Sequence, residues 1–132
     1  MMASTILIVD DEPDLVNSYA RMLARSGYCC LPAFDGAQAM ALFDREHPDL
    51  IVTDLNLPAA SGIEVIRHAH ESSPRTPIIA ITGHCADGMT DAAQAAGASV
   101  CLQKPVGLAE LDALVRTALR LNALGVSSEC DE

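Results

Sequence analysis

One stretch of nine residues, 50–58, constrains the fold of this chain more than any other. Its sequence is Leu-Ile-Val-Thr-Asp-Leu-Asn-Leu-Pro, so apolar residues lead into a single aspartate, Asp54, and turn residues follow at Pro58 and Gly62. A short apolar run bounded by turn residues is typical of a strand buried on both faces of a sheet. Open parallel sheets bind ligands at the carboxyl ends of their strands. We therefore expect Asp54 to lie in a functional site.

Helical patterns alternate with further apolar runs along the rest of the chain. Strands are predicted at residues 5–9, 28–31, 50–54, 77–82 and 100–103, and helices at 13–26, 36–47, 62–73, 89–96 and 108–124. Asp35 with Gln38, and Ser61 with Glu64, are expected to cap the second and third helices. Five alternations of strand and helix predict an α/β fold with a parallel sheet covered on both faces.

The composition favours one small, acidic domain. The chain has 132 residues, half of them hydrophobic, and no Trp, so its core must be aliphatic. Eighteen acidic residues against eight Lys and Arg give a net charge of −10. Because nucleic acids and anionic membranes repel such a chain, we expect no direct nucleic-acid contact and no membrane contact.

The sequence also favours the cytoplasm. No apolar run is long enough to span a bilayer, and the first residues lack the features of a signal peptide. Five cysteines without regular spacing indicate reduced thiols rather than a disulfide framework. Cys29 and Cys30, neighbours in a predicted strand, should point to opposite faces of the sheet.

Acidic residues follow two of the predicted strands. Asp10 and Asp11 come directly after the first strand, and Asp54 ends the third. Three adjacent carboxylates raise one another's pKa values unless a cation neutralises them. Mg²⁺ takes oxygen ligands, so we predict a magnesium site with Asp11 and Asp54 as direct ligands and Asp10 bound directly or through water. The backbone carbonyl of Asn56 could supply a further oxygen.

Two more strand ends carry groups that suit a phosphoryl group. Thr82 ends the fourth strand and offers a hydroxyl donor, and Lys104 follows the fifth and offers a compact positive charge. Phosphoryl transfer depends mainly on positioning and charge neutralisation, and a carboxylate can be the nucleophile. We assign that role to Asp54.

These motifs together resemble the receiver domain of two-component response regulators. The resemblance rests on Asp10-Asp11, on Asp54 with Pro58 and Gly62, on Thr82-Gly83 and on Lys104-Pro105, and it covers about residues 4–124. It implies a flavodoxin-like (βα)5 three-layer sandwich with strand order 2-1-3-4-5. Residues 125–132 form an acidic tail that we expect to lack fixed structure.

The resemblance also implies a function. A histidine kinase or histidine phosphotransfer protein would phosphorylate Asp54 with Mg²⁺ held at Asp10, Asp11 and Asp54, and partner binding would then change. Thr82, Gly83 and Lys104 would contact the phosphoryl group, and the Lys104–Pro105 peptide bond would be cis. Such a domain assists its own phosphorylation and dephosphorylation and is not otherwise an enzyme.

One position departs from the family pattern, and two others are expected to tune the reaction. Family members usually carry an aromatic residue three positions before the lysine, where this chain has Cys101. The switch must therefore depend on residues 83–90 and the fourth helix, or be muted. Asn56 and His84 occupy positions that tune dephosphorylation in the family, and our hypothesis is that they set the phosphoryl lifetime by controlling water access.

Alternative functions remain open from the sequence. A magnesium-dependent phosphatase is one, although Asn56 occupies the place of its second, acid–base carboxylate. A receiver-like scaffold that is never phosphorylated is another, and Cys101 keeps it open. A flavin carrier of similar topology is disfavoured because flavin phosphate sites avoid clustered carboxylates.

Two helices raise separate questions. His68 and His70, two apart on a helix, do not face each other, so we expect a solvated face rather than a metal site. The last helix is apolar around much of its girth, with Leu108, Leu111, Val115 and Leu119 predicted to face the core. Its other apolar residues, Leu114 and Leu121, have two possible roles. They either pack deeply against the rest of the domain, or they belong to a surface of the fourth helix, fifth strand and fifth helix that contacts a target or a second copy of the chain. The sequence leaves the cognate kinase, the target, the oligomeric state and any longer parent protein undetermined.

Overall fold

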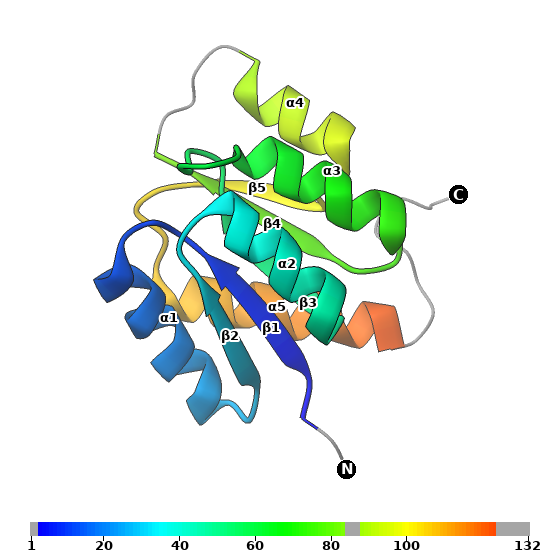
Figure 1. The fold of residues 1–132 in the computed structure, drawn as a ribbon. Helices are drawn as coiled ribbons and strands as arrows, with labels where there is room; N and C mark the ends of the chain where they lie inside the picture. The colour runs from blue at the N-terminus through cyan, green and yellow to red at the C-terminus, as the bar shows by residue number, and fades with distance from the viewer. Residues whose placement is uncertain (1–2, 84–87, 124–132) are drawn as a thin grey trace.

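A five-stranded parallel sheet forms the middle layer of the molecule (Figure 1). This is a computed structural model, and it describes residues 3–83 and 88–123. The strands are β1 (Thr5–Val9), β2 (Cys29–Ala33), β3 (Leu50–Asp54), β4 (Ile78–Thr82) and β5 (Val100–Gln103). Their order is β2-β1-β3-β4-β5, which confirms the predicted topology.

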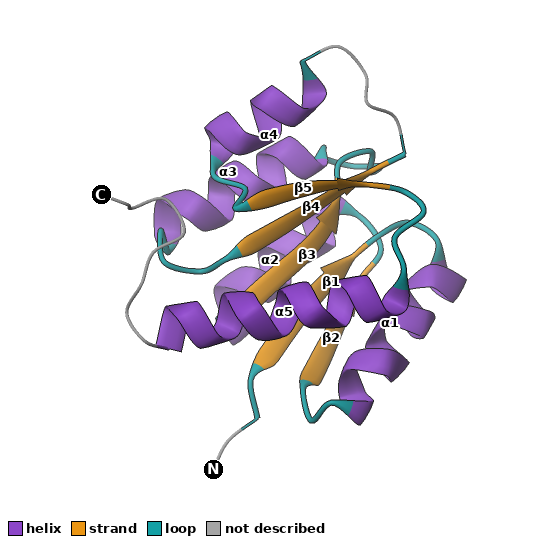
Figure 2. Ribbon diagram, turned by 180° about the vertical axis from the view of Figure 1, so that it is seen from behind, coloured by secondary structure: helices purple, strands orange, loops and turns teal. Residues whose placement is uncertain are grey.

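Helices cover both faces of the sheet. They are α1 (Pro13–Arg25), α2 (Gly36–Glu46), α3 (Gly62–Ser72), α4 (Met89–Ala96) and α5 (Leu108–Ala123). Helices α1 and α5 lie on one face, and α2, α3 and α4 lie on the other (Figures 1 and 2). Among the described residues, no helix combines the length and apolar composition needed to cross a membrane.

Burial divides the strands into a centre and two edges. The side chains of β1, β3 and β4 are almost wholly buried, and they form the aliphatic core that the composition requires. Strands β2 and β5 have one neighbour each and stay partly exposed. Strand β2 runs two residues beyond the predicted segment and includes Pro32, which an edge strand tolerates because its missing N–H costs no ladder bond.

The helix caps follow the sequence closely. The backbone N–H of Gln38 donates to Asp35 Oδ1 at 2.7 Å, and the Gln38 side chain accepts from the N–H of Phe34, one residue before the predicted position. The N–H of Glu64 donates to Ser61 Oγ at 3.2 Å. These caps fix the starts of α2 and α3 close to the carboxyl edge of the sheet.

Three side chains differ from the expectation. Leu108 is the first residue of α5 and is 43% exposed, because the buried face of that helix begins one turn later at Leu111. His68 and His70 are partly buried rather than solvated. His68 Nε2 lies 2.7 Å from Asp44 Oδ1 on α2, and His70 lies against Gly97 at the end of α4.

Candidate functional site

Three carboxylates meet at the carboxyl edge of the sheet, as predicted. Asp10 follows β1, and Asp54 ends β3, its neighbour in the sheet. One oxygen from each of these residues and from Asp11 lies within 4.8 Å of the others. Asp10 and Asp54 are only 2% and 5% exposed, whereas Asp11 is exposed. The cluster therefore consists of two buried acids, Asp10 and Asp54, and a third acid, Asp11, that is open to solvent.

Backbone groups hold the two buried carboxylates in place. Asp10 Oδ1 accepts the N–H of Glu12 at 3.0 Å, and Asp54 Oδ1 accepts the N–H of Asn56 at 3.2 Å. Each bond forms a tight local turn immediately after a buried strand. Gly62, the first residue of α3, lies against the turn that follows Asp54, and a Cβ on Gly62 would lie 2.6 Å from the Leu55 Cα. Glycine at this position therefore lets α3 begin directly behind Asp54.

Lys104 brings its ammonium group between the two buried acids. Its Nζ lies 3.0 Å from Asp10 Oδ2 and 3.1 Å from Asp54 Oδ2. The backbone N–H of Lys104 donates to the Thr82 carbonyl at 2.8 Å, and the Lys104–Pro105 bond is cis, as predicted. The hydrogen bond to Thr82 ties residue 104 to the end of β4, and from there the Lys104 side chain reaches the acid cluster.

A third acid near Lys104 was not anticipated from the sequence. Glu12 Oε1 lies 3.6 Å from Lys104 Nζ. The available signal was its position directly after Asp10-Asp11, at the N-cap of α1, where the chain must pass the cluster. Lys104 therefore has three acidic neighbours, Asp10, Glu12 and Asp54.

Burial and charge set the protonation of the site. Burial raises the pKa of Asp54, while the Asn56 N–H and the Lys104 ammonium oppose that rise. Burial alone would lower the pKa of Lys104, but its hydrogen bonds to Asp10 and Asp54 raise it well above its ordinary value. Lys104 therefore stays charged at neutral pH, which suits the binding of an anion.

The remaining predicted site residues lie around this centre. Thr82 ends β4 and is buried, and the next residue, Gly83, is exposed with open space where a Cβ would stand. Asn56 is exposed beside Asp54. Cys101 lies on β5, partly buried, with its Sγ 3.8 Å from Thr90 Oγ1. His84 lies outside the described residues.

Comparison with known proteins identifies the family. The sequence profile described as the response regulator receiver domain matches residues 6–116. This chain belongs to the response regulator receiver family. Receiver domains are modules of two-component signalling whose general function is to be phosphorylated on an aspartate and which interact with histidine kinases.

Relatives and solved structures agree with that assignment. The chain is 38% identical over 117 residues to the transcriptional regulatory protein TrcR of Mycobacterium tuberculosis, covering 87% of this chain and 45% of TrcR. It is 34% identical over 127 residues to the alkaline phosphatase synthesis transcriptional regulatory protein PhoP of Bacillus subtilis, covering 96% of this chain and 53% of PhoP. A CheY-like receiver domain from Methanospirillum hungatei superposes with a TM-score of 0.91 at 27% identity, covering 94% of this chain and 99% of that one.

The relatives leave the nucleic-acid prediction without support. The receiver domain spans about half the length of TrcR and PhoP, both of which are named as transcriptional regulators. The net charge of −10 belongs to this chain alone. Because the charge of one domain does not determine the charge of another, the negative charge of this chain does not exclude nucleic-acid contact by a longer protein that contains it.

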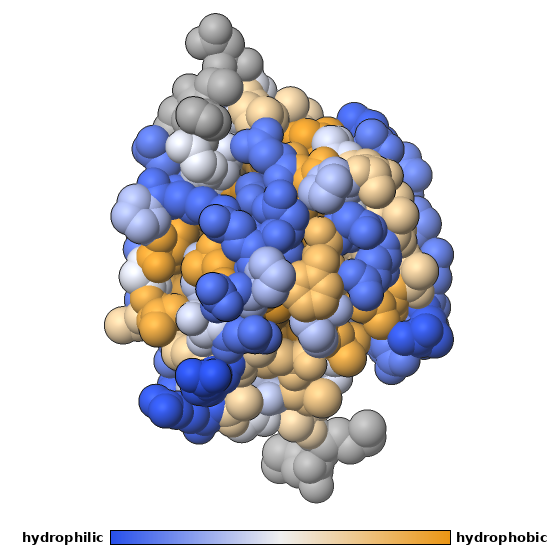
Figure 3. Space-filling view, turned by 60° about the vertical axis from the view of Figure 1, so that its left-hand side comes forward, coloured by the Kyte–Doolittle hydropathy of each residue, from blue (hydrophilic) through white to orange (hydrophobic). Residues whose placement is uncertain are grey.

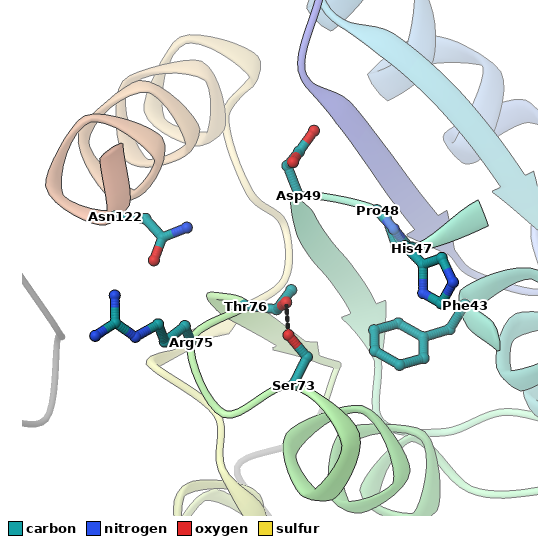
Figure 4. Close-up of a pocket in the computed structure, with 8 residues that line it drawn as sticks. All are labelled: Phe43, His47, Pro48, Asp49, Ser73, Arg75, Thr76 and Asn122. Atoms are coloured by element: carbon teal, nitrogen blue, oxygen red, sulfur yellow. Dashed lines mark hydrogen bonds between the residues drawn. The ribbon is translucent and has the colours of Figure 1, made fainter. Parts of the chain in front are cut away.

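The two ends of the sheet carry different groups of side chains. Figure 3 shows the side toward which the strands' carboxyl ends point, with hydrophilic residues in a band across its middle and apolar residues on both sides. Figure 4 shows a pocket of about 230 Å³ at the other end, between the ends of α2, α3 and α5. Its lining carboxylate, Asp49, accepts the N–H of Thr5 at 2.7 Å. Asp49 is the one carboxylate in the lining of that pocket, whereas three carboxylates meet at the carboxyl edge of the sheet.

Proposed function

We propose that this receiver domain accepts a phosphoryl group on Asp54 from a histidine kinase or histidine phosphotransfer protein. The observation that carries the proposal is the position of Lys104 Nζ, within 3.1 Å of both Asp10 and Asp54 in a cluster of three carboxylates. One fixed cation beside a buried carboxylate is the arrangement that the transfer of an anionic group onto that carboxylate needs.

The acid cluster fits a hard divalent cation. Its donors are all oxygens, they come from Asp10, Asp11 and Asp54, and they lie close enough together to share one ion. Asp11 is exposed, which leaves the cluster open to solvent on one side. The backbone carbonyl of Asn56 is the fourth protein ligand in this proposal. When bound, Mg²⁺ neutralises negative charge on the transferring phosphoryl group.

The residues of this chain then divide the work of transfer. An Asp54 carboxylate oxygen forms a bond to phosphorus as the phosphorus–nitrogen bond of the donor histidine breaks. The electron pair of that bond stays on the imidazole nitrogen, which takes a proton from solvent. Lys104 and the Thr82 hydroxyl donate hydrogen bonds to the phosphoryl oxygens, and the Gly83 backbone N–H is the third donor.

Asn56 and His84 are proposed to set the lifetime of the phosphoryl group on Asp54 by controlling the access of water. Asn56 is exposed beside Asp54, where its side chain can limit the approach of water to the acyl phosphate. We expect Asn56→Ala and His84→Ala each to change the rate of phosphoryl loss. Decay at the parent rate in both variants would remove this assignment.

The phosphorylated domain is proposed to act in the cytoplasm by changing a contact through α4, β5 and α5. Two large apolar side chains on α5, Leu108 and Leu121, are 43% and 37% exposed. That exposure supports a dimer or target contact on this side of the molecule.

Incubation with acetyl phosphate and Mg²⁺, followed by intact mass measurement, tests the proposal. We expect one phosphoryl group per chain, stable in acid and lost in base, and none with EDTA or in Asp54→Asn. Continuous release of phosphate from many substrates would instead indicate a phosphatase. Absence of labelling under all conditions would leave the unphosphorylated scaffold and overturn the proposal.

A further inference from the structure

The ammonium group of Lys104 has one donor that the two buried acids do not use. An ammonium has three N–H groups. Two of them donate to Asp10 and Asp54, at 3.0 and 3.1 Å. The third is available to Glu12, whose Oε1 lies 3.6 Å from Lys104 Nζ, which is close enough for an ion pair but longer than a charge-assisted hydrogen bond. A phosphoryl oxygen that takes this donor must therefore displace Glu12.

Glu12 differs from the other acidic neighbours of Lys104 in its exposure. Its side chain is 66% exposed, whereas those of Asp10 and Asp54 are 3% and 6% exposed. An exposed carboxylate forms a weak ion pair, so Glu12 contributes little to holding Lys104 in place. Its negative charge nevertheless lies at the solvent side of the site and acts on any anion that approaches Lys104.

The surface in front of this ion pair is a hollow with an acidic lining. Its volume is about 580 Å³, and its lining includes Asp11, Glu12 and Asp14. Asp11 also belongs to the acid cluster, so the hollow adjoins the site. A phosphodonor that approaches Lys104 from this side therefore passes the Glu12 carboxylate.

We propose that Glu12 is a specificity-determining residue that selects phosphodonors by their charge. The inference rests on the proposed function, because it needs a phosphoryl group that moves to Asp54 beside Lys104. Two unit charges about 6 Å apart, at an effective dielectric constant of about 60, change a rate about fivefold. Glu12 therefore slows a dianionic donor such as acetyl phosphate more than a monoanion such as phosphoramidate. A phosphohistidine with a protonated imidazole is also a monoanion and is favoured in the same way.

The Glu12→Gln variant removes this charge and keeps the local backbone. Glu12 is the N-cap residue of α1, but its side chain makes no cap hydrogen bond, and the bond to Asp10 comes from its backbone N–H. The midpoint of thermal unfolding should therefore stay within about 2 °C of the parent. This measurement separates a charge effect from damage to the fold.

Initial rates of labelling with each donor, measured by intact mass with Mg²⁺ at low ionic strength, test the inference. An Asp54 oxygen bonds to phosphorus while acetate leaves acetyl phosphate, or ammonia leaves phosphoramidate, with the electron pair of the broken bond. In Glu12→Gln the rate should rise about 25-fold with acetyl phosphate and about fivefold with phosphoramidate, so the ratio of the two rates should change about fivefold. In about 1 M salt, which screens exposed charges, this change should fall below about twofold.

Asp14→Asn is the matched control. Asp14 lines the same hollow but is not among the three acids that pair with Lys104. Its removal should change the ratio of the two rates by less than about twofold. If the parent is labelled and Glu12→Gln keeps the parent ratio, or Asp14→Asn changes it equally, this inference fails while the proposed function stands. If neither donor labels the parent, the proposed function fails and the selection by Glu12 fails with it.

Discussion

The central strands and the edge strands of this receiver domain contribute different things to one site. Strands β1 and β3 are buried and supply Asp10 and Asp54, which backbone N–H groups hold in place. Strand β5 is a partly exposed edge, and it supplies Lys104 together with the thiol that contacts α4. The carboxylates therefore stand on the most buried strands of the sheet, whereas their cation comes from a more exposed edge, where local stability is lower.

The largest effect is expected from disturbing the central strands through Gly62. A Cβ at this position would overlap the backbone of Asp54 and Leu55. Because backbone cannot move aside as a flexible side chain can, Gly62→Ala should lower the free energy of unfolding by about 3 kcal/mol, the upper end for overpacking. Urea denaturation measures this loss.

Gly83→Ala is the matched control. A Cβ there has no neighbour within 4 Å, so its stability should stay within about 0.5 kcal/mol of the parent. Equal losses in the two variants would mean that the turn behind Asp54 is no more tightly packed than the exposed end of β4.

A smaller loss is expected from removing the edge strand's cation. Lys104→Met leaves Asp10 and Asp54 buried without their shared ammonium partner. The free energy of unfolding of the metal-free protein should fall by about 2 kcal/mol, and Mg²⁺ should stabilise the variant more than the parent, because the ion replaces the missing charge. Thermal unfolding with EDTA and with Mg²⁺ measures both effects.

Arg116→Met provides the comparison for the loss of a positive charge. Arg116 pairs with Asp112 on the exposed side of α5, so its removal should cost less than about 1 kcal/mol. It should also leave the response to Mg²⁺ unchanged. A Lys104→Met protein that behaved like Arg116→Met would contradict the account of the site.

The sequence predicted the residues at the strand ends better than the contacts between separate elements. Asp10, Asp11, Asp54 and Lys104 could be placed because each lies at or directly after the end of a predicted strand, and the ends of parallel strands meet at one edge of the sheet. The Lys104–Glu12, Thr90–Cys101 and His68–Asp44 contacts could not be predicted, because they depend on side-chain directions across separate elements. Leu108 was wrongly assigned to the core since periodicity does not show where a helix starts to overlie the sheet.

Asp54→Asn should give a modest gain in the stability of the metal-free protein at pH 7. Burial raises the pKa of Asp54 above its ordinary 3.8, so ionising it costs the folded state free energy that asparagine avoids. As the pH falls through the raised pKa toward 3.8, Asp54 takes up a proton in the folded parent protein. The difference in the free energy of unfolding between Asp54→Asn and the parent should therefore narrow. Denaturation of both proteins in EDTA across this range measures it. A stability difference between Asp54→Asn and the parent that grows as the pH falls would contradict a raised pKa for Asp54.

The smallest effect concerns the other edge strand and leaves stability unchanged. Burial raises the pKa of Cys30 to about 11, whereas Cys29 is exposed. Because only the thiolate reacts, iodoacetamide at pH 8 should label Cys29 quickly and Cys30 slowly, with both reacting in urea. Mass spectrometry of Cys29→Ser and Cys30→Ser separates the two thiols. Equal labelling rates for Cys29 and Cys30 in the folded protein would mean that the Cys30 thiol on β2 is not protected by burial.

The identity of the phosphorylated residue is the most direct test of the central claim. Borohydride reduction converts an aspartyl phosphate to homoserine, so peptide sequencing after treatment with acetyl phosphate and Mg²⁺ locates the modified side chain. We expect homoserine at position 54 and unmodified Asp10 and Asp11. Homoserine at position 10 or 11, with Asp54 intact, would contradict it.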